Sequence, residues 1–151
     1  YTMAIDTAQE IGDKTNESTH LGNLGNTLFQ QNRIEESEAA FRKAIPIGDE
    51  ALPVAAGAFR ASLALLLAQK GKVDEAQGLL KIGEAQVTAH RNEHAKLLCT
   101  KGQVLLLSGD NEAASVTLNQ AKELVIAHNL GVYPEVSQAI SDLERLLSDR
   151  R

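Results

Sequence analysis

The chain has 151 residues, enough for about one domain, and its 20 acidic side chains outnumber 15 basic ones to give a net charge of −5. An acidic chain does not suit binding to nucleic acid or to an anionic membrane surface, and its longest purely apolar run, residues 63–68, is far shorter than the roughly 20 residues that cross a bilayer. The single cysteine, Cys99, excludes a disulfide within the chain and favours a reducing compartment, the cytoplasm.

The composition predicts an all-α fold. Hydrophobic residues make up 43% of the chain but aromatic residues only 3%, and 11 glycines and 3 prolines leave few turn formers. Alanine and leucine, both strong helix formers, must therefore do most of the packing. The apolar periodicity predicts helices, in chain order, over residues 2–11, 16–31, 34–47, 53–70, 73–89, 93–108, 111–129 and 134–149.

Short polar links are expected between some of these helices. The clearest are residues 12–14, 48–50 and 90–93. Pro46 falls in the last turn of a predicted helix and should kink or end it there, because proline removes a helical hydrogen bond.

Two landmarks recur along the chain at one spacing. The first is a small residue in the first helix of successive helix pairs, at Gly25, Ala64 and Gly102. The second is a bulky residue in the second helix of each pair, at Phe41, Leu80 and Leu118. Both sets repeat after 39 and then 38 residues. A fixed period of this length predicts stacked helical hairpins, because one hairpin cannot bury its apolar stripe alone.

The predicted turn within each hairpin contains a residue that tolerates positive φ. These residues are Asn32, Gly71 and Gly109. Asp74 and Asp110 follow two of the turns, where a carboxylate oxygen can cap the next helix.

These repeated residues resemble those of a known family. Leu24-Gly25, Leu28, Phe41 and Ala44 resemble the tetratricopeptide repeat signature, and the 38–39-residue period resembles a long-repeat subfamily. That subfamily includes Leu-Gly-Asn-type scaffolds and the tetratricopeptide regions of bacterial signalling proteins. The resemblance implies a right-handed superhelical solenoid of stacked antiparallel hairpins, ending in a C-terminal capping helix.

The same register divides the chain into units. Within a single domain over residues 1–151 we expect a half repeat at 1–13, repeats at 16–50, 53–90 and 93–131, and the capping helix at 134–151. Tyr1 and Ala4 take the bulky and small places of the half repeat. We therefore expect the chain to be a fragment of a longer protein.

The sequence offers nothing that predicts catalysis. Its histidines, at positions 20, 90, 94 and 128, do not form a zinc-binding pattern, and Cys99 has no neighbouring cysteine. Gly22 and Gly25 lack the Gly-Lys-Ser/Thr of a phosphate loop, so close helix packing explains them better. We expect no catalytic residue, no metal site and no cofactor.

Binding is better supported. The resemblance implies that the first helix of each pair lines a concave groove that holds a protein or peptide. Asn23 and Asn26 lie three residues apart and hence on one face, where carboxamides can donate to and accept from a peptide backbone. The predicted groove residues are Asn23, Asn26, Phe29, Gln30, Leu65, Gln69, Lys96 and Gln103, and the same helix faces carry Thr19, Ala58, Ala61, Ser62, Thr100 and Leu107.

Two alternatives stay open beside this non-catalytic scaffold. The segment can serve as a sensor or regulatory part of a larger bacterial signalling ATPase, cyclase or transcription regulator. It can also be a self-assembly module that associates through its open N-terminal end.

Overall fold

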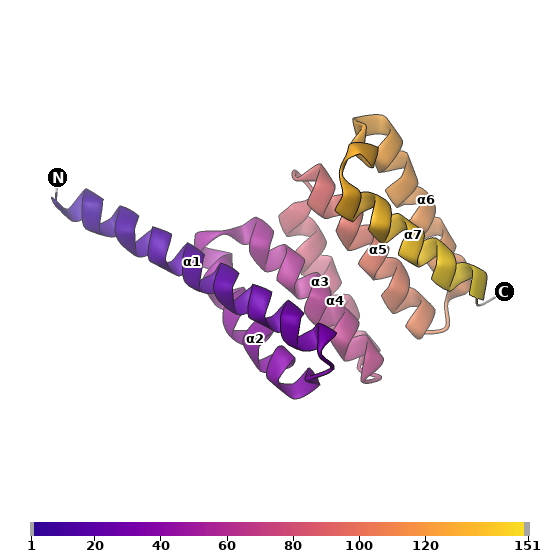
Figure 1. Cartoon of the computed structure of the whole chain (residues 1–151), viewed down its shortest axis with the longest axis horizontal. Helices are drawn as coiled ribbons and strands as arrows, with labels where there is room; N and C mark the ends of the chain where they lie inside the picture. The colour runs from indigo at the N-terminus through magenta and orange to yellow at the C-terminus, as the bar shows by residue number, and fades with distance from the viewer. Residues whose placement is uncertain (1, 150–151) are drawn as a thin grey trace.

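The computed structural model describes the backbone of residues 2–149 and the side chains of residues 10–149. Within this part the chain forms helices and no strand (Figure 1). In chain order they are α1 (Thr2–Gln30), α2 (Ile34–Ala51), α3 (Pro53–Gln69), α4 (Val73–Val87), α5 (Arg91–Leu107), α6 (Asn111–His128), the short 3₁₀ helix η1 (Leu130–Val132) and α7 (Pro134–Asp149). The predicted all-α stack of hairpins is confirmed.

The hairpins are α1–α2, α3–α4 and α5–α6, and they lie one after another along the molecule (Figure 1). Their turns pass through Asn32, Gly71 and Gly109 with φ angles of 62°, 83° and 88°, as the sequence predicts. Asp110 caps α6 by accepting a hydrogen bond of 3.0 Å from the backbone N–H of Ala113. Asp74 does not cap α4, because that helix begins one residue before it, at Val73.

The first prediction that the structure overturns is the link at residues 12–14, since α1 runs unbroken from Thr2 to Gln30. Gly12 costs the helix only about 1 kcal/mol. Lys14 lies 3.8 Å from Glu10 one turn earlier and 3.4 Å from Glu50 of α2. Tyr1 and the side chain of Ala4 lie outside the described residues, so the assignment of residues 1–13 to a half repeat stays a prediction.

The second link, at residues 48–50, is also wrong, and α2 does not end at Pro46 but continues to Ala51. Gly48 is a packing residue within the helix: a Cβ there would lie 2.8 Å from the Ser18 hydroxyl oxygen and 3.1 Å from the Ala56 Cβ. The break comes at Leu52, whose φ of −155° and ψ of 78° are extended. Pro53 causes it, because a proline disfavours helical geometry in the residue before it.

The third link, at residues 90–93, is shorter than predicted because α5 begins at Arg91. The preceding hairpin is tightly closed. A Cβ on Gly57 of α3 would lie 2.8 Å from the carbonyl oxygen of Gly83, and one on Gly83 of α4 would lie 2.9 Å from that of Gly57. These two glycines let the backbones of α3 and α4 come into contact.

Most of the core falls into two clusters of buried side chains, beside a small third group of Ala95, Leu130 and Val136. The larger joins α2, α3 and α4 and takes Leu97 and Val104 from α5. The other joins α5, α6 and α7 and contains Leu98 and Cys99. Helix α5 therefore belongs to both clusters and connects the two parts of the stack.

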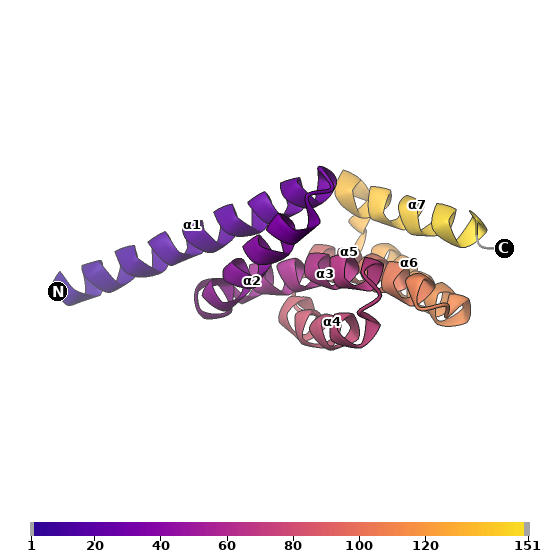
Figure 2. The ribbon, with the colours of Figure 1, turned by 90° about the horizontal axis from the view of Figure 1, so that it is seen from below.

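Helix α7 packs on α5 and α6 through the buried side chains of Val136, Leu143 and Leu147. Leu143 lies over Gly102 of α5, where a Cβ would be 2.5 Å from the Leu143 Cδ2 atom. In Figure 2, helices α1 and α7 lie on one side of α3, and helix α4 lies on its opposite side. Residues of α1, α3, α5 and α7 line one common cavity, so the first helices share one face of the stack with α7.

Candidate functional site

The face made by the first helices contains a cavity of about 280 Å³, which we call the first-helix pocket. It receives side chains from four helices, α1, α3, α5 and α7. Its lining is Asn26, Ala58, Phe59, Ala61, Ser62, Glu93, Lys96, Leu97, Thr100 and Ala139. The alanine side chains that line it are short, and the side chains of Phe59 and Leu97 form part of the buried core beneath it.

The polar side chains of the first-helix pocket differ in whether they already form a hydrogen bond or an ion pair within the chain. Neither the Asn26 carboxamide nor the Ser62 hydroxyl forms a hydrogen bond with another residue in the described part of the chain. Thr100 donates its hydroxyl hydrogen to the carbonyl oxygen of Lys96 at 3.3 Å, which leaves the lone pairs of the Thr100 oxygen available. The Lys96 ammonium is paired with Glu93 at 2.9 Å. The pocket thus combines free neutral hydrogen-bonding groups with one internally balanced ion pair.

The structure brings two of the eight predicted groove residues, Asn26 and Lys96, into this pocket. The others lie elsewhere on the first helices. Asn23, Gln30 and Gln69 are exposed, and Gln103 is half-buried. Phe29 and Leu65 are half-buried and pack against the larger core cluster.

Four residues of the first-helix pocket were not among the candidates from the sequence: Phe59, Glu93, Leu97 and Ala139. Glu93 was assigned to a link, whereas α5 begins two residues before it. Ala139 belongs to α7, which was expected only to cover the end of the stack. Its position three residues after the buried Val136 is the signal that could have found it, because residues three apart share a helix face.

A comparison with protein families decides the assignment. Residues 18–52, which cover the C-terminal part of α1 and all of α2, match the profile of the tetratricopeptide repeat family. This segment is a tetratricopeptide repeat. The predicted resemblance is confirmed, and the match supports a general role as a protein-interaction scaffold, since such repeats are typically non-catalytic. A search of curated proteins found no match to the chain.

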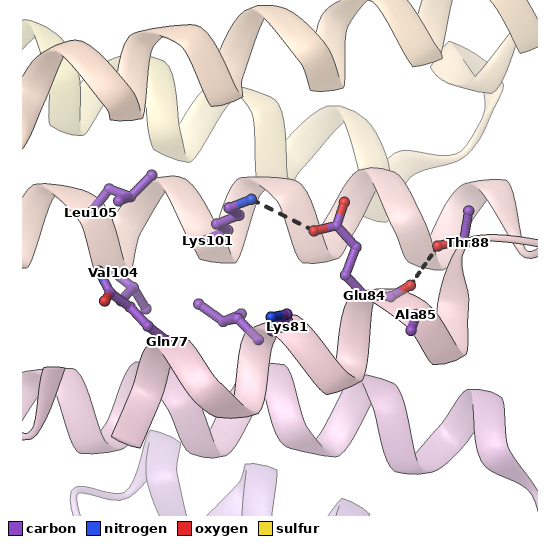
Figure 3. A pocket seen from close by; sticks show the side chains of 9 residues that line it. Gln77, Lys81, Glu84, Ala85, Thr88, Lys101, Val104 and Leu105 are labelled. Carbon is purple, nitrogen blue, oxygen red and sulfur yellow. Dashed lines mark hydrogen bonds and ion pairs between the residues drawn. The ribbon is translucent and has the colours of Figure 1, made fainter. Parts of the chain in front are cut away.

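The helix stack also carries a depression on the side of its second helices (Figure 3). Between α4 and α5 it has a volume of about 490 Å³ and is lined by Gln77, Leu80, Lys81, Glu84, Ala85, Thr88, Lys101, Val104 and Leu105. A second depression of about 510 Å³, between α5 and α6, is lined by Lys101, Leu105, Asp110, Glu112, Ala113, Val116, Thr117 and Gln120. Because they share Lys101 and Leu105, we treat them as one surface, the second-helix groove.

Helix α5 contributes residues to both sites of the helix stack. Consecutive residues of an α-helix are turned by about 100°, so Thr100 and Lys101 point to different sides. Thr100 lines the first-helix pocket, and Lys101 lines the second-helix groove. The two sites are therefore separate surfaces.

The charges of the second-helix groove are unevenly paired. Glu84 contacts two basic side chains: its Oε1 atom lies 3.6 Å from the Lys101 ammonium (Figure 3), and its Oε2 atom lies 3.0 Å from the His94 Nε2 atom. Lys81 forms no ion pair within the described part of the chain. The wall at α4 and α5 thus has more positive than negative charge, whereas Asp110 and Glu112 make the end near the α5–α6 turn acidic.

Other features that could support chemistry are structural. Among residues 10–149, no group of three or more His, Cys, Asp or Glu side chains is placed to hold a metal ion. Cys99 is buried, and burial, followed by the nearby Asp142 carboxylate, raises the pKa of its thiol to about 12. Arg60 is held by Asp49 at 2.6 Å and by Gln86 at 2.7 Å, which ties α3 to α2 and α4. No described helix is long and apolar enough to span a membrane.

Proposed function

We propose that this tetratricopeptide chain is a non-catalytic scaffold that binds a peptide segment of a partner protein in the first-helix pocket. The observation that carries the proposal is that the side chains of Asn26 and Ser62 line the pocket and have no hydrogen-bond partner within the described residues. A carboxamide and a hydroxyl can each donate and accept, so together they suit a peptide group.

The size and charge of the pocket indicate what kind of segment it accepts. A volume of about 280 Å³ is below that of most sites for complete small molecules and suits one or two side chains of a peptide. Glu93 neutralises Lys96, so the pocket offers no free charge for a terminal carboxylate. The segment we expect is neutral at this point, with a small apolar side chain against Ala58 and Ala61 and its backbone bonded to Asn26.

The proposal places the chain in the cytoplasm. Its single cysteine lies in the core, and no disulfide can form within the chain.

The decisive experiment selects peptides that bind the whole chain from a displayed library and measures their affinities by calorimetry. Asn26→Ala should weaken binding of a selected peptide about threefold to tenfold, the value of one net hydrogen bond, and leave the melting temperature nearly unchanged. Asn16→Ala is the matched control, because Asn16 is exposed on the same helix and lies outside the pocket. Equal binding by wild type and Asn26→Ala for every selected peptide would remove the proposal.

A further inference from the structure

At the second-helix groove, two positions of α5 are less buried than the corresponding positions of α3 one repeat earlier. With the 38-residue offset that relates Ala64 to Gly102, Leu63 and Leu67 of α3 correspond to Lys101 and Leu105 of α5. Leu63 and Leu67 are 1% and 0% exposed, in a cluster with Phe41 of α2. Lys101 and Leu105 are only half-buried, although they occupy the same register.

The side chains that join the second helices α2 and α4 have no counterpart between α4 and α6. Between α2 and α4, Arg42 reaches Glu75 at 2.9 Å, and beside it Lys70 reaches Glu38 at 3.0 Å. No ion pair joins α4 to α6 among residues 10–149, and Val116 of α6 is 53% exposed at the edge of the groove. Helix α5 therefore forms the floor of a groove whose walls, α4 and α6, are not tied together.

The dimensions of the second-helix groove suit a helical occupant. The lining residues of α4 and its C-cap extend from Gln77 to Thr88, a length of about 16 Å or three helical turns at 1.5 Å per residue. The half-buried Leu105 offers apolar surface for the ridge of such a helix, above the buried side chains of Leu80 and Val104.

The charges of the groove indicate the polarity of that helix. The groove has two ammonium groups, of Lys81 and Lys101, and one carboxylate beside them, that of Glu84, which contacts Lys101 and His94 but not Lys81. At the end of the groove near the α5–α6 turn, the side chains of Asp110 and Glu112 are acidic. An acidic side chain near the middle of the occupant and a basic one at its end complement these charges.

We propose that the second-helix groove is a docking site for an amphipathic helical segment of a partner protein. Its apolar stripe lies on Leu105, an acidic side chain pairs with Lys81 and Lys101, and a basic side chain pairs with Asp110 and Glu112. This site is distinct from the first-helix pocket, so the scaffold holds two segments at once.

The test uses two synthetic helical peptides of about four turns, each labelled with fluorescein. The first has a leucine stripe at positions i, i+3 and i+7, glutamates beside its centre and lysines at one end. The second has the same composition and net charge, with the glutamates and lysines exchanged. Fluorescence anisotropy with the whole chain should show that the first peptide binds at least about tenfold more tightly.

Charge reversal in the chain provides the matched test. The double variant Lys81→Glu/Lys101→Glu should reverse the preference and bind the exchanged peptide more tightly. Lys43→Glu, a single reversal at an exposed residue of α2 that matches Lys81→Glu in charge, should leave both affinities unchanged. Because Lys101→Glu also loses the contact with Glu84, Lys81→Glu alone is measured too, and it should reduce the preference at least threefold while circular dichroism shows an unchanged melting curve.

Leu105→Glu should abolish binding of both peptides, since it places a carboxylate on the apolar floor. Equal affinity for the two peptides, absence of binding at millimolar peptide, or indifference to Lys81→Glu would each overturn the proposal. Sedimentation of the chain without peptide tests whether a second copy of the chain occupies the groove instead. A dimer that Leu105→Glu dissociates would show that a second copy fills the groove and would also overturn it.

Discussion

The ring of Phe59 fills the space beside Gly22 in which any larger residue would place its Cβ atom. One turn later on the same face of α1, a Cβ on Gly25 would lie 2.8 Å from the ring of Phe41. The two ring centroids are 6.3 Å apart with planes inclined by 35°. Helix α1 therefore receives one aromatic ring from α2 and one from α3, and its two glycines are the sockets for them.

Replacing Gly22 with alanine should destabilise the chain by about 1–3 kcal/mol, because the ring of Phe59 must move within a packed core. The gain in helix propensity of about 1 kcal/mol does not offset this. Urea unfolding followed by circular dichroism measures the change. Adding Phe59→Leu to Gly22→Ala should reduce the cost of the alanine, since the smaller side chain frees the socket.

Gly78→Ala is the control for this prediction. Gly78 lies on the exposed side of α4, and a Cβ there would have no neighbour within 4 Å. That variant should stabilise the chain by about 1 kcal/mol through helix propensity alone. If Gly22→Ala proved as stable as Gly78→Ala, the contact with Phe59 would be refuted.

Much of the fold follows from the sequence because the repeat leaves a readable period. Each hairpin turn needs a residue with positive φ, and Asn32, Gly71 and Gly109 mark the three turns. The helix ends were harder to predict. Gly12 and Gly48 look like breaks in the sequence, yet both lie inside helices, Gly12 facing open space and Gly48 packed against Ser18.

The sites could be predicted only in part. Asn26 lines a pocket with Lys96, consistent with the pattern of polar residues on first helices. The second-helix groove depends on the distance between α4 and α6, which no periodicity records. Its one sign in the sequence is Lys101, a charged residue at the register where α3 carries Leu63.

Phe41→Ala should cost about 3–5 kcal/mol, and Leu80→Ala should cost less. Phe41 is 0% exposed and enclosed by α1, α2 and α3, so its loss leaves a cavity that cannot collapse. Leu80 is 4% exposed and lines the second-helix groove, where water can reach the space it vacates. Denaturant unfolding of both variants measures the difference. A cost below about 1 kcal/mol for Phe41→Ala would show that the repeat register is wrong.

Ser37→Ala should destabilise the chain by about 0.5–1.5 kcal/mol. The buried Ser37 hydroxyl donates to the carbonyl oxygen of Gly25 at 2.7 Å, which ties α2 to α1. The cost stays small because the Gly25 carbonyl can still accept within its helix. Thermal unfolding measures it, with Ser141→Ala, at an exposed position on α7, as the control. Identical stabilities of the two variants would contradict a contribution from this bond.

The free energy of unfolding should fall as the pH drops below about 4.5. Hydrogen bonds from Lys70 and then Arg42 lower the pKa of Glu38, and Arg60 lowers the pKa of Asp49. A carboxylate with a lowered folded-state pKa stabilises the fold above its unfolded pKa, and this contribution is lost as the pH falls through the folded value. Glu38→Gln should therefore show a flatter acid limb in urea unfolding between pH 7 and 3. The control Glu17→Gln, at an exposed residue of α1, should keep the wild-type slope.

The rate at which thiol reagents label Cys99 should report how readily α5 opens from the core. Its side chain is 1% exposed, and burial raises the pKa of the thiol to about 12. At pH 8 the thiolate fraction is then about a thousandfold below that of an unfolded cysteine, so labelling of the folded chain should be at least that much slower than in urea. The variant Cys99→Ala/Ser141→Cys moves the thiol to the exposed side of α7 and should react at nearly the unfolded rate. Rapid labelling of Cys99 in the folded chain would mean that α5, which both binding surfaces share, opens from the core far more readily than its packing predicts.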